Sequence, residues 1–263
     1  LKAATNAGAQ NADVDGFVEL AGLTLKHKGI TGLPSDIRVD VDIHGDLQKK
    51  PFDVRAFNIK APAVALNTKV RIESPSVAGI QDANVELRVT DLARVVAILP
   101  KGSGVLPPEL TLEGPFEVDL KGDAAAGSLR VDLDAAHLAW ADVFNKQQKT
   151  PLNLKVAAKR AGDRINLPSV TLVLDNAKLT GSASVSTKEG APMEAALDTG
   201  LVTLASLKGV LPPVQKALTK KGTKVDGTFR LQATAKAAGE KQALHAQLDL
   251  SQVDVAMDAV TAK

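Results

Sequence analysis

The sequence predicts an all-β fold: a long antiparallel meander of repeated units, each with one short amphipathic helix. Three observations predict it. Apolar and polar residues alternate along most of the 263 residues, as they do in strands with one buried face. Short turns such as 121–123 and 161–163 carry Gly and Asp, and such turns join antiparallel neighbours. Long segments also return at a spacing of roughly 113 residues, which is typical of repeat proteins.

The repeat divides the chain into three units of one continuous, elongated array. Its matched segments are 90–100 with 202–212, 114–118 with 227–231, 129–134 with 244–249, and 37–41 with 152–156. We therefore expect a truncated first unit over 1–104, a complete second unit over 105–216 and a truncated third unit over 217–263. Arrays of this kind usually act through one long shared surface.

The first unit is expected to hold five strands and then a helix. In 35–47, aliphatic residues at every second position alternate with charged or polar ones, and the other strands follow the same rule. A helix is expected at 91–99, because Asp91 can cap it, Pro100 can stop it and an apolar stripe recurs at helical spacing. That stripe is Leu92, Val95, Val96 and Leu99; the five strands are 14–26, 35–47, 51–60, 63–73 and 80–90.

The second unit repeats this plan. Its clearest alternation is in 109–121, where Leu110, Leu112, Gly114, Phe116, Val118 and Leu120 would share one face of a single strand. The strands expected in this unit are 109–121, 127–140, 150–159, 163–174, 177–187 and 192–199. A second helix is expected at 203–218, with Leu204, Leu207 and Leu211 on one side, and two further strands at 223–236 and 241–256.

Composition narrows the class of protein. A net charge of +2, from 32 basic and 30 acidic residues, provides no field for holding nucleic acid. The absence of cysteine removes disulfides, thiolate catalysis and Cys-based zinc sites. No run of 18 apolar residues occurs, so no helical membrane span is expected in this piece. Because the chain begins at Leu1 without an initiator Met, we expect it to be a fragment of a longer protein.

Residues with catalytic or metal-binding spacing do not stand out, so we expect no enzyme, no cofactor and no metal site. The four histidines, His27, His44, His137 and His245, are far apart in the sequence, and none has a second ligand at metal spacing. Carboxylate pairs such as Asp40 with Asp42 are expected to be solubilising charge on outward strand faces. The only basic cluster, Lys216, Lys220, Lys221 and Lys224, is expected to be a solvated loop, with attraction to anionic lipid as a minor role.

The alternating apolar faces are therefore the candidate functional feature. They are almost purely aliphatic, since the chain has six Phe, one Trp and no Tyr. Two structures would produce such faces. In a closed β-sandwich they would pack against each other, although such cores usually include several aromatic anchors. In an open sheet they would leave a large aliphatic surface, and such surfaces mark binding sites. The pattern alone leaves both structures open.

Several segments resemble the repeated C-terminal region of AsmA-like proteins. The resemblance is carried by Asp91-Leu92-Ala93 with Ile98-Leu99-Pro100, by the block 106–122 and by 129–138, and it extends over nearly the whole chain. Its motifs are patterns of aliphatics, Gly and Pro. AsmA-like proteins, with the related TamB group, resemble bridge-like lipid transfer proteins built from repeating β-groove units. The resemblance implies an inner-membrane anchor and a periplasmic body whose groove shields acyl chains between the two membranes of Gram-negative bacteria.

We therefore predict an open, twisted sheet curled into a trough that passively binds and transports phospholipid between the inner and outer membranes. Its partners would be phospholipid acyl chains and, through parts outside this fragment, membrane surfaces or their proteins. The alternative is a periplasmic or surface spacer of closed sandwich repeats. The expected lining residues are Val39, Val41, Ile43, Val64, Leu66, Val85, Leu87, Leu110, Leu112, Phe116, Val118, Leu120, Leu129, Val131, Leu133, Leu152, Leu154, Val156, Leu172, Leu174, Leu179, Phe229, Leu231, Leu244 and Leu248.

Overall fold

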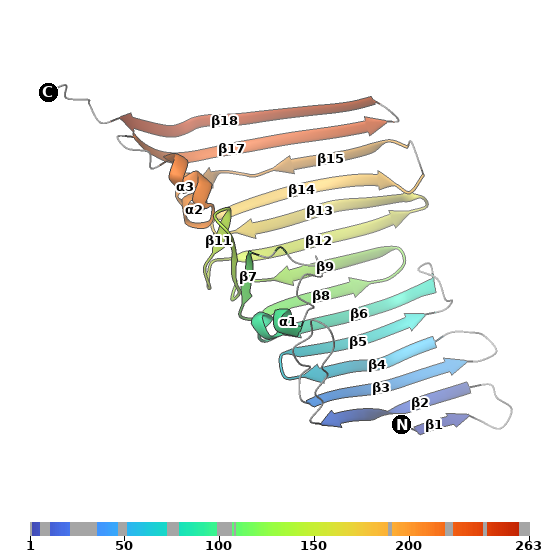
Figure 1. Ribbon diagram of the computed structural model, residues 1–263. Helices are drawn as coiled ribbons and strands as arrows, with labels where there is room; N and C mark the ends of the chain where they lie inside the picture. Colours follow the sequence, from blue (N-terminus) through green and yellow to red (C-terminus); the bar gives the residue numbers. More distant parts are fainter. Residues whose placement is uncertain are drawn as a thin grey trace. The chain divides into compact units, whose positions relative to one another are not determined.

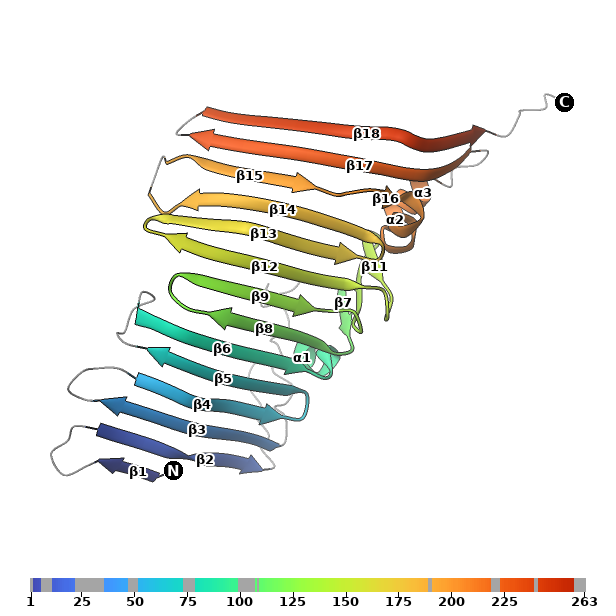
Figure 2. The same cartoon turned by 180° about the vertical axis from the view of Figure 1, so that it is seen from behind.

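The structure is a computed structural model that describes residues 2–5, 11–21, 36–46, 52–72, 79–98, 107, 109–188, 191–218, 223–238 and 241–257. Antiparallel strands make up most of it, helices are few, and the sheet is not closed (Figures 1 and 2). The prediction of a predominantly antiparallel β fold is therefore confirmed.

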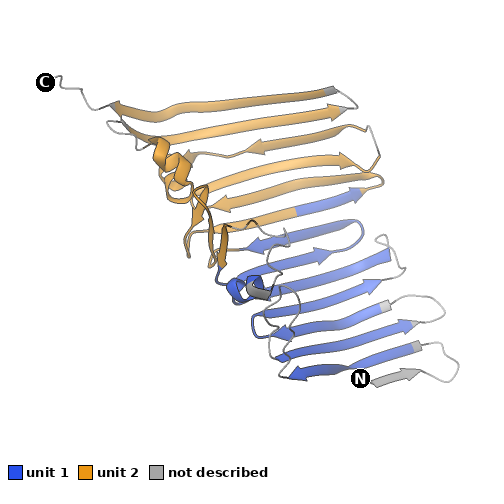
Figure 3. Cartoon of the chain, viewed as in Figure 1, with its two compact units in different colours: residues 1–106, 113–132, 157–160 blue, residues 107–112, 133–156, 161–263 orange. Residues whose placement is uncertain are grey.

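The chain forms two compact units (Figure 3). Unit 1 contains residues 1–106, 113–132 and 157–160, and unit 2 contains 107–112, 133–156 and 161–263. These boundaries differ from those of the sequence repeat, because they follow spatial contacts and not similarity. The three-unit division stays a prediction.

Unit 1 is a meander in which strands that follow each other in the chain are neighbours in the sheet. Helix α1 (Leu92–Ile98) lies between β6 and β8 in the sequence. In the part of the unit that the structure describes, the strands run in the order β1 (Lys2–Thr5), β2 (Asn11–Ala21), β3 (Asp36–Asp46), β4 (Phe52–Ala61), β5 (Val64–Ile72), β6 (Ile80–Val89), β8 (Phe116–Gly122) and β9 (Ala126–Asp132).

Unit 2 contains a second run of long strands, a small sheet and two helices. The long strands are β12 (Leu152–Ala161, of which 157–160 group with unit 1), β13 (Arg164–Leu174), β14 (Ala177–Ser186), β15 (Met193–Asp198), β17 (Thr223–Ala238) and β18 (Lys241–Met257). The short β16 (Val202–Thr203) also pairs with β17. The small sheet has the order β11 (Phe144–Lys146), β10 (His137–Trp140) and β7 (Leu110–Glu113). The helices are α2 (Leu204–Val210) and α3 (Pro212–Leu218).

The predicted helix 91–99 is confirmed over the residues that the structure describes. Asp91 caps it, because its Oδ1 accepts hydrogen bonds from the backbone N–H groups of Ala93 (3.0 Å) and Arg94 (3.3 Å). The backbone N–H of Leu92 also donates to the carbonyl of Gly114 (2.8 Å) and ties the helix to the start of β8. Leu99 and Pro100 lie outside the described residues.

The predicted helix 203–218 is two helices. Thr203 caps α2, and its side-chain oxygen accepts from the backbone N–H of Ser206. Pro212 has no N–H to continue the hydrogen bonding of α2, so the chain leaves the helical conformation at Leu211 and α3 begins at the proline.

Two predicted strands are wrong in extent. The run 109–121 is split at Gly114, whose φ of +84° takes the chain out of the extended conformation. Residues before it form β7 of the small sheet, and residues after it form β8 of unit 1. The predicted strand 127–140 ends as β9 at Asp132, because a turn follows in which Ala136 N–H donates to the Leu133 carbonyl (3.0 Å). Residues 22–26 of the predicted first strand lie outside the described residues.

Fully buried apolar side chains lie mainly where a helix meets the sheet. In unit 1 they are Val89 at the end of β6, Leu92 at the start of α1, and Ala63 in the turn between β4 and β5, whose carbonyl accepts from Thr90 N–H (3.0 Å). In unit 2, Val202 and Val210 come from β16 and α2, and Ala177 begins β14. Helices α1 and α2 therefore each help to complete a local core at one end of the strands.

Candidate functional site: an aliphatic sheet face

Strand register places the aliphatic residues of unit 1 on one face, which we call the aliphatic face. Residues directly opposite each other in antiparallel strands share a face. One row crosses unit 1 from β2 to β9 through Val18, Val39, Ile59, Leu66, Leu87, Val118 and Val131. The next row runs through Gly16, Val41, Phe57, Thr68, Val85, Leu120 and Leu129.

Twelve of the predicted lining residues therefore lie on one face of unit 1. They are Val39, Val41, Ile43, Val64, Leu66, Val85, Leu87, Phe116, Val118, Leu120, Leu129 and Val131. Ile43 lies opposite Val54 on this face, and Val89 lies between Val64 and Phe116 in a further row. The period-2 alternation of the sequence identified this face correctly.

The opposite face of unit 1 is charged. A row through Glu19, Arg38, Lys60, Ala65, Arg88, Glu117 and Asp132 crosses the same strands. Ion pairs occur along this face between Arg71 and Asp53 (3.3 Å), and between Arg130 and Asp132 (2.8 Å). Unit 1 thus presents one aliphatic and one hydrated surface.

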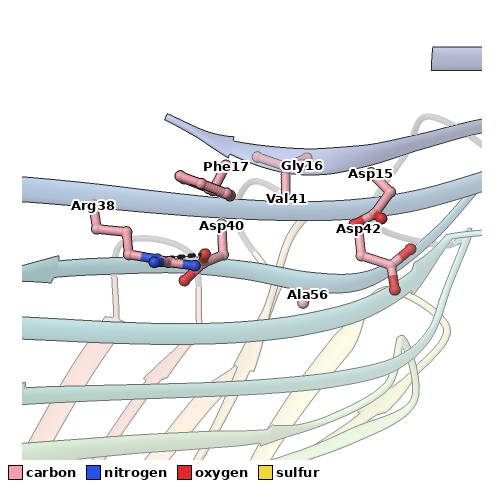
Figure 4. Close-up of a pocket in the computed structure, with 8 residues that line it drawn as sticks. All are labelled: Asp15, Gly16, Phe17, Arg38, Asp40, Val41, Asp42 and Ala56. Carbon is pink, nitrogen blue, oxygen red and sulfur yellow. Dashed lines mark hydrogen bonds and ion pairs between the residues drawn. The ribbon is translucent and has the colours of Figure 1, made fainter. Parts of the chain in front are cut away.

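Figure 4 is a close-up of the charged face and shows that an aromatic residue, Phe17, lies beside Arg38 there. Phe17 is 51% exposed there, and the Arg38 guanidinium lies 4.3 Å from the centre of its ring. Arg38 also donates through Nε to Asp40 Oδ1 (2.8 Å). With Asp15 and Asp42, these residues surround an open hollow of about 430 Å³. Carboxylates dominate its polar lining, so this hollow suits water better than an apolar ligand.

The aliphatic face is only partly covered. Most of its side chains are half-buried, and Val18, Leu20 and Leu120 are exposed by 42%, 41% and 44%. The main contacts of the long strands are with their sheet neighbours and, in unit 2, with α2 and α3. In the described part of unit 1 the long strands form one sheet, whereas unit 2 also contains the small sheet of β11, β10 and β7. A single layer leaves one side of each apolar residue facing outward.

Unit 2 has the same division into two faces. One row runs through Leu167, Ala183, Ala195, Ala235 and Leu244, and the next through Val170, Gly181, Leu197, Ala233 and Ala246. The predicted residues Leu172, Leu174 and Leu179 belong to this face, as do Leu231 and Leu248, which lie opposite each other. Phe229 lies opposite Val202 of β16.

The remaining predicted residues fall elsewhere. Leu110 and Leu112 are on β7 of the small sheet, so their expected place beside Phe116 is wrong. Leu133 follows the end of β9, and its N–H donates to the Leu152 carbonyl (2.9 Å). Leu152, Leu154 and Val156 occupy alternate, half-buried positions of β12.

Sequence reasoning missed part of the face. Val18, Phe57 and Ile59 complete the rows of unit 1, and the same alternation could have identified them. The alanine floor of unit 2 was harder to find, because Ala183, Ala195 and Ala235 alternate with residues that are also small or polar. Small side chains give only a weak periodic signal.

Titratable groups of the described residues form ion pairs and turns. Arg230 holds the pKa of Asp198 well below its usual range, mainly by donating hydrogen bonds to the carboxylate, and Gly200 N–H adds another (2.8 Å). Turn N–H groups of Ala126 and Ala125 lower the pKa of Asp123. Among the residues that the structure describes, no three His, Asp or Glu side chains gather as metal ligands would. No helix of this part is long and apolar enough to cross a membrane.

Comparisons with protein-family models, with characterised proteins and with solved structures found no match to this chain.

Proposed function

We propose that the aliphatic faces bind the acyl chains of phospholipids, and that the protein passively transports phospholipid between the inner and outer membranes of a Gram-negative cell envelope. The observation that carries the proposal is the sheet of long strands in each unit, with one partly exposed aliphatic face and one polar or charged face. Acyl chains on the aliphatic face would leave head groups in water, so no charge is desolvated. Burial contributes about 25 cal/mol per Å² of apolar surface, which suffices to hold a lipid without directional contacts.

Two further features support transport over simple binding. Thr68 is the one polar side chain in the rows described above, so the floor provides few directional polar partners and a bound acyl chain can slide from one strand to the next. The segments that repeat in the sequence also form corresponding elements. In chain order, α1 comes between β6 and β8, and α2 and α3 come between β15 and β17; in each case the two strands pair with each other in the antiparallel sense. In our proposal these units are troughs that act in series, as in repeat arrays.

The proposed cellular setting comes from the resemblance to AsmA-like proteins. In that setting the chain lies in the periplasm, the whole protein serves outer-membrane lipid homeostasis, and no chemical step is involved. A spacer of closed sandwiches would need a second sheet over each aliphatic face. The partial exposure of the aliphatic face in the described part of each unit favours the lipid-binding role.

One substitution tests the proposal. Val131 is half-buried on the aliphatic face opposite Val118, so Val131→Glu places a carboxylate where acyl chains would lie while water can still reach it. We expect phospholipid binding to be lost and the free energy of unfolding to fall by about 1–3 kcal/mol. Ser128→Glu is the matched control, because Ser128 lies on the charged face of the same strand, opposite Lys121.

Native mass spectrometry of the purified chain and its variants would measure copurified phospholipid, and far-UV circular dichroism would measure folding. We expect phospholipid with the unchanged chain and with Ser128→Glu. Phospholipid retained by a folded Val131→Glu variant would contradict the proposal. Global unfolding of that variant alone would instead indicate a face buried in a closed core.

A further inference from the structure

The aliphatic face of unit 2 deepens at one end into an open hollow of about 520 Å³. Its floor is Ala183, Ala195 and Ala235, which lie side by side on β14, β15 and β17. Met193 and Leu244 stand around this floor and are 44% and 77% exposed. The volume falls within the range of about 300–1,000 Å³ found for sites that bind small molecules.

The other end of the same strands is closed. Val202 and Val210 are 2% and 3% exposed where β16 and α2 meet the sheet, and Ala177, at the start of β14, is 2% exposed. Because β14 runs from Ala177 to Ser186, this closed end and the hollow lie at opposite ends of one strand. An acyl chain can therefore enter the aliphatic face of unit 2 from the hollow and not from the helix end.

Several charged side chains at the open end belong to the polar face of the sheet. Arg164, Lys188 and Lys236 stand at or beside strand ends there, against Asp163 and Glu194. Lys188 pairs with Asp163 (2.7 Å) and Lys236 pairs with Glu194 (3.3 Å). The Arg164 guanidinium donates to Ser184 Oγ (3.4 Å), and the register of β14, β15 and β17 places Ser184, Glu194 and Lys236 on the face opposite Ala183, Ala195 and Ala235. The hollow is therefore lined mainly by apolar side chains, and a lipid head group at its rim would stay in water.

We propose that this hollow is the port through which a phospholipid enters unit 2, with its head group in water at the open rim and its acyl chains pointing toward α2. This inference rests on the proposed function and adds an orientation and a point of access to it. The hollow accepts the first part of the acyl chains, the aliphatic rows carry the rest, and the helix end stops them.

The absence of cysteine from the chain makes the orientation measurable. Met193→Cys places one label at the hollow, and Leu231→Cys places one near the closed end, where the Leu231 N–H bonds to Thr199 Oγ1 (2.9 Å). Each variant of the full chain would be labelled with bimane and loaded with phosphatidylglycerol that carries a nitroxide on the head group or at the chain end. We expect the head-group nitroxide to quench the label at 193 several-fold more than the label at 231, and the chain-end nitroxide to do the reverse.

Three other results would overturn the inference. Equal quenching at both positions, or the opposite preference, would reject the orientation while leaving lipid binding intact. No quenching by either nitroxide at either position would reject the port and the proposed function together.

A second pair of variants tests the hollow itself. Ala195→Leu fills its floor, whereas Ala196→Leu adds the same side chain at the next residue, on the opposite face beside Thr234. Both residues are exposed, so both variants should fold. We expect the rate of lipid uptake from phosphatidylglycerol vesicles to fall several-fold for Ala195→Leu and to stay unchanged for Ala196→Leu. Equal rates for the two variants would overturn the proposal.

Discussion

Single residues decide how closely the last two strands approach, and Gly227 is the clearest case. Its φ of +109° disfavours any side chain, and a Cβ built there would overlap the carbonyl oxygen of Gln252 on β18. Gly209 has open space around its Cα and lies inside α2. The backbone therefore requires glycine at position 227, whereas another residue could stand at position 209.

We expect Gly227→Ala to lower the free energy of unfolding by about 1–3 kcal/mol, because the new methyl group forces the paired strands apart. Gly209→Ala should raise it by about 0.5–1 kcal/mol, because alanine favours the helix. Urea denaturation of both variants would measure these changes. Equal effects of the two substitutions would contradict the assignment of strain to Gly227.

Asp198 is a carboxylate through which we expect acid to destabilise unit 2. Its carboxylate accepts from Arg230, Gln232 and Gly200, and its pKa in the folded protein is well below the ordinary value of about 3.9. A lowered folded-state pKa contributes stability that is complete above the unfolded-state value and is lost as the pH falls toward the folded-state value. Unit 2 should therefore lose stability as the pH drops below about 4.

Removing either partner should weaken this acid dependence. We expect Asp198→Asn and Arg230→Gln each to give a shallower fall in the unfolding free energy below about pH 4. Both remove the hydrogen bonds between Arg230 and the Asp198 carboxylate, which lower the pKa of Asp198 in the folded protein. Urea titrations at a series of pH values would give the slopes. An unchanged slope in both variants would show that other carboxylates govern acid unfolding.

At the scale of elements, the short helices complete local cores at the ends of strands. Leu92 of α1 is 7% exposed, and Val89 and Ala63 beside it are 3% and 5% exposed. In α2, the buried residues are Ser206 and Val210, whereas Leu204, Leu207 and Leu211 are half-buried. The helices thus have a structural role at these positions. A second role of the helices, as a lid that restricts which lipids reach the aliphatic face, stays a hypothesis.

We expect Leu92→Ser to lower the free energy of unfolding by about 2–5 kcal/mol, because it empties a packed site and buries a hydroxyl. Ala93→Ser, at the next and exposed residue, should change it by less than about 0.5 kcal/mol. Thermal and urea melts would measure both. A stable Leu92→Ser variant with faster lipid exchange would indicate instead that α1 is a lid over the aliphatic face.

At the scale of the whole molecule, the long β17 ties several parts of unit 2 together. It pairs with β15, β16 and β18, and Lys208 Nζ of α2 donates to the Val225 carbonyl (2.6 Å). Arg230 reaches back to Asp198 of β15. Because of these contacts we expect the last segment to unfold cooperatively with the rest of unit 2.

We therefore expect deletion of residues 223–263 to lower the cooperativity and the midpoint of thermal unfolding of the remaining chain, because β15 and α2 lose their partners. Calorimetry of the full and shortened chains would measure both quantities. An unchanged transition in the shortened chain would argue for independent domains.

The sequence by itself determined the strand faces. Alternation at Val39, Val41 and Ile43 places these side chains on one face wherever the strand goes, because successive residues of an extended chain point to opposite sides. The same rule identified the face of Val118 and Val131. It also located α1, since Asp91 and the stripe that begins at Leu92 are local signals.

Only the tertiary structure decided which strands share a sheet and how much of each face stays uncovered. Leu110 and Phe116 follow one alternating pattern, yet the turn at Gly114 sends them to different sheets, because period-2 patterning is unaffected by a change of direction between strands. The hollow over Ala183, Ala195 and Ala235 likewise depends on registers between strands that are distant in the sequence. Exposure is a property of neighbours in space, so a single layer and a closed sandwich can arise from the same alternation.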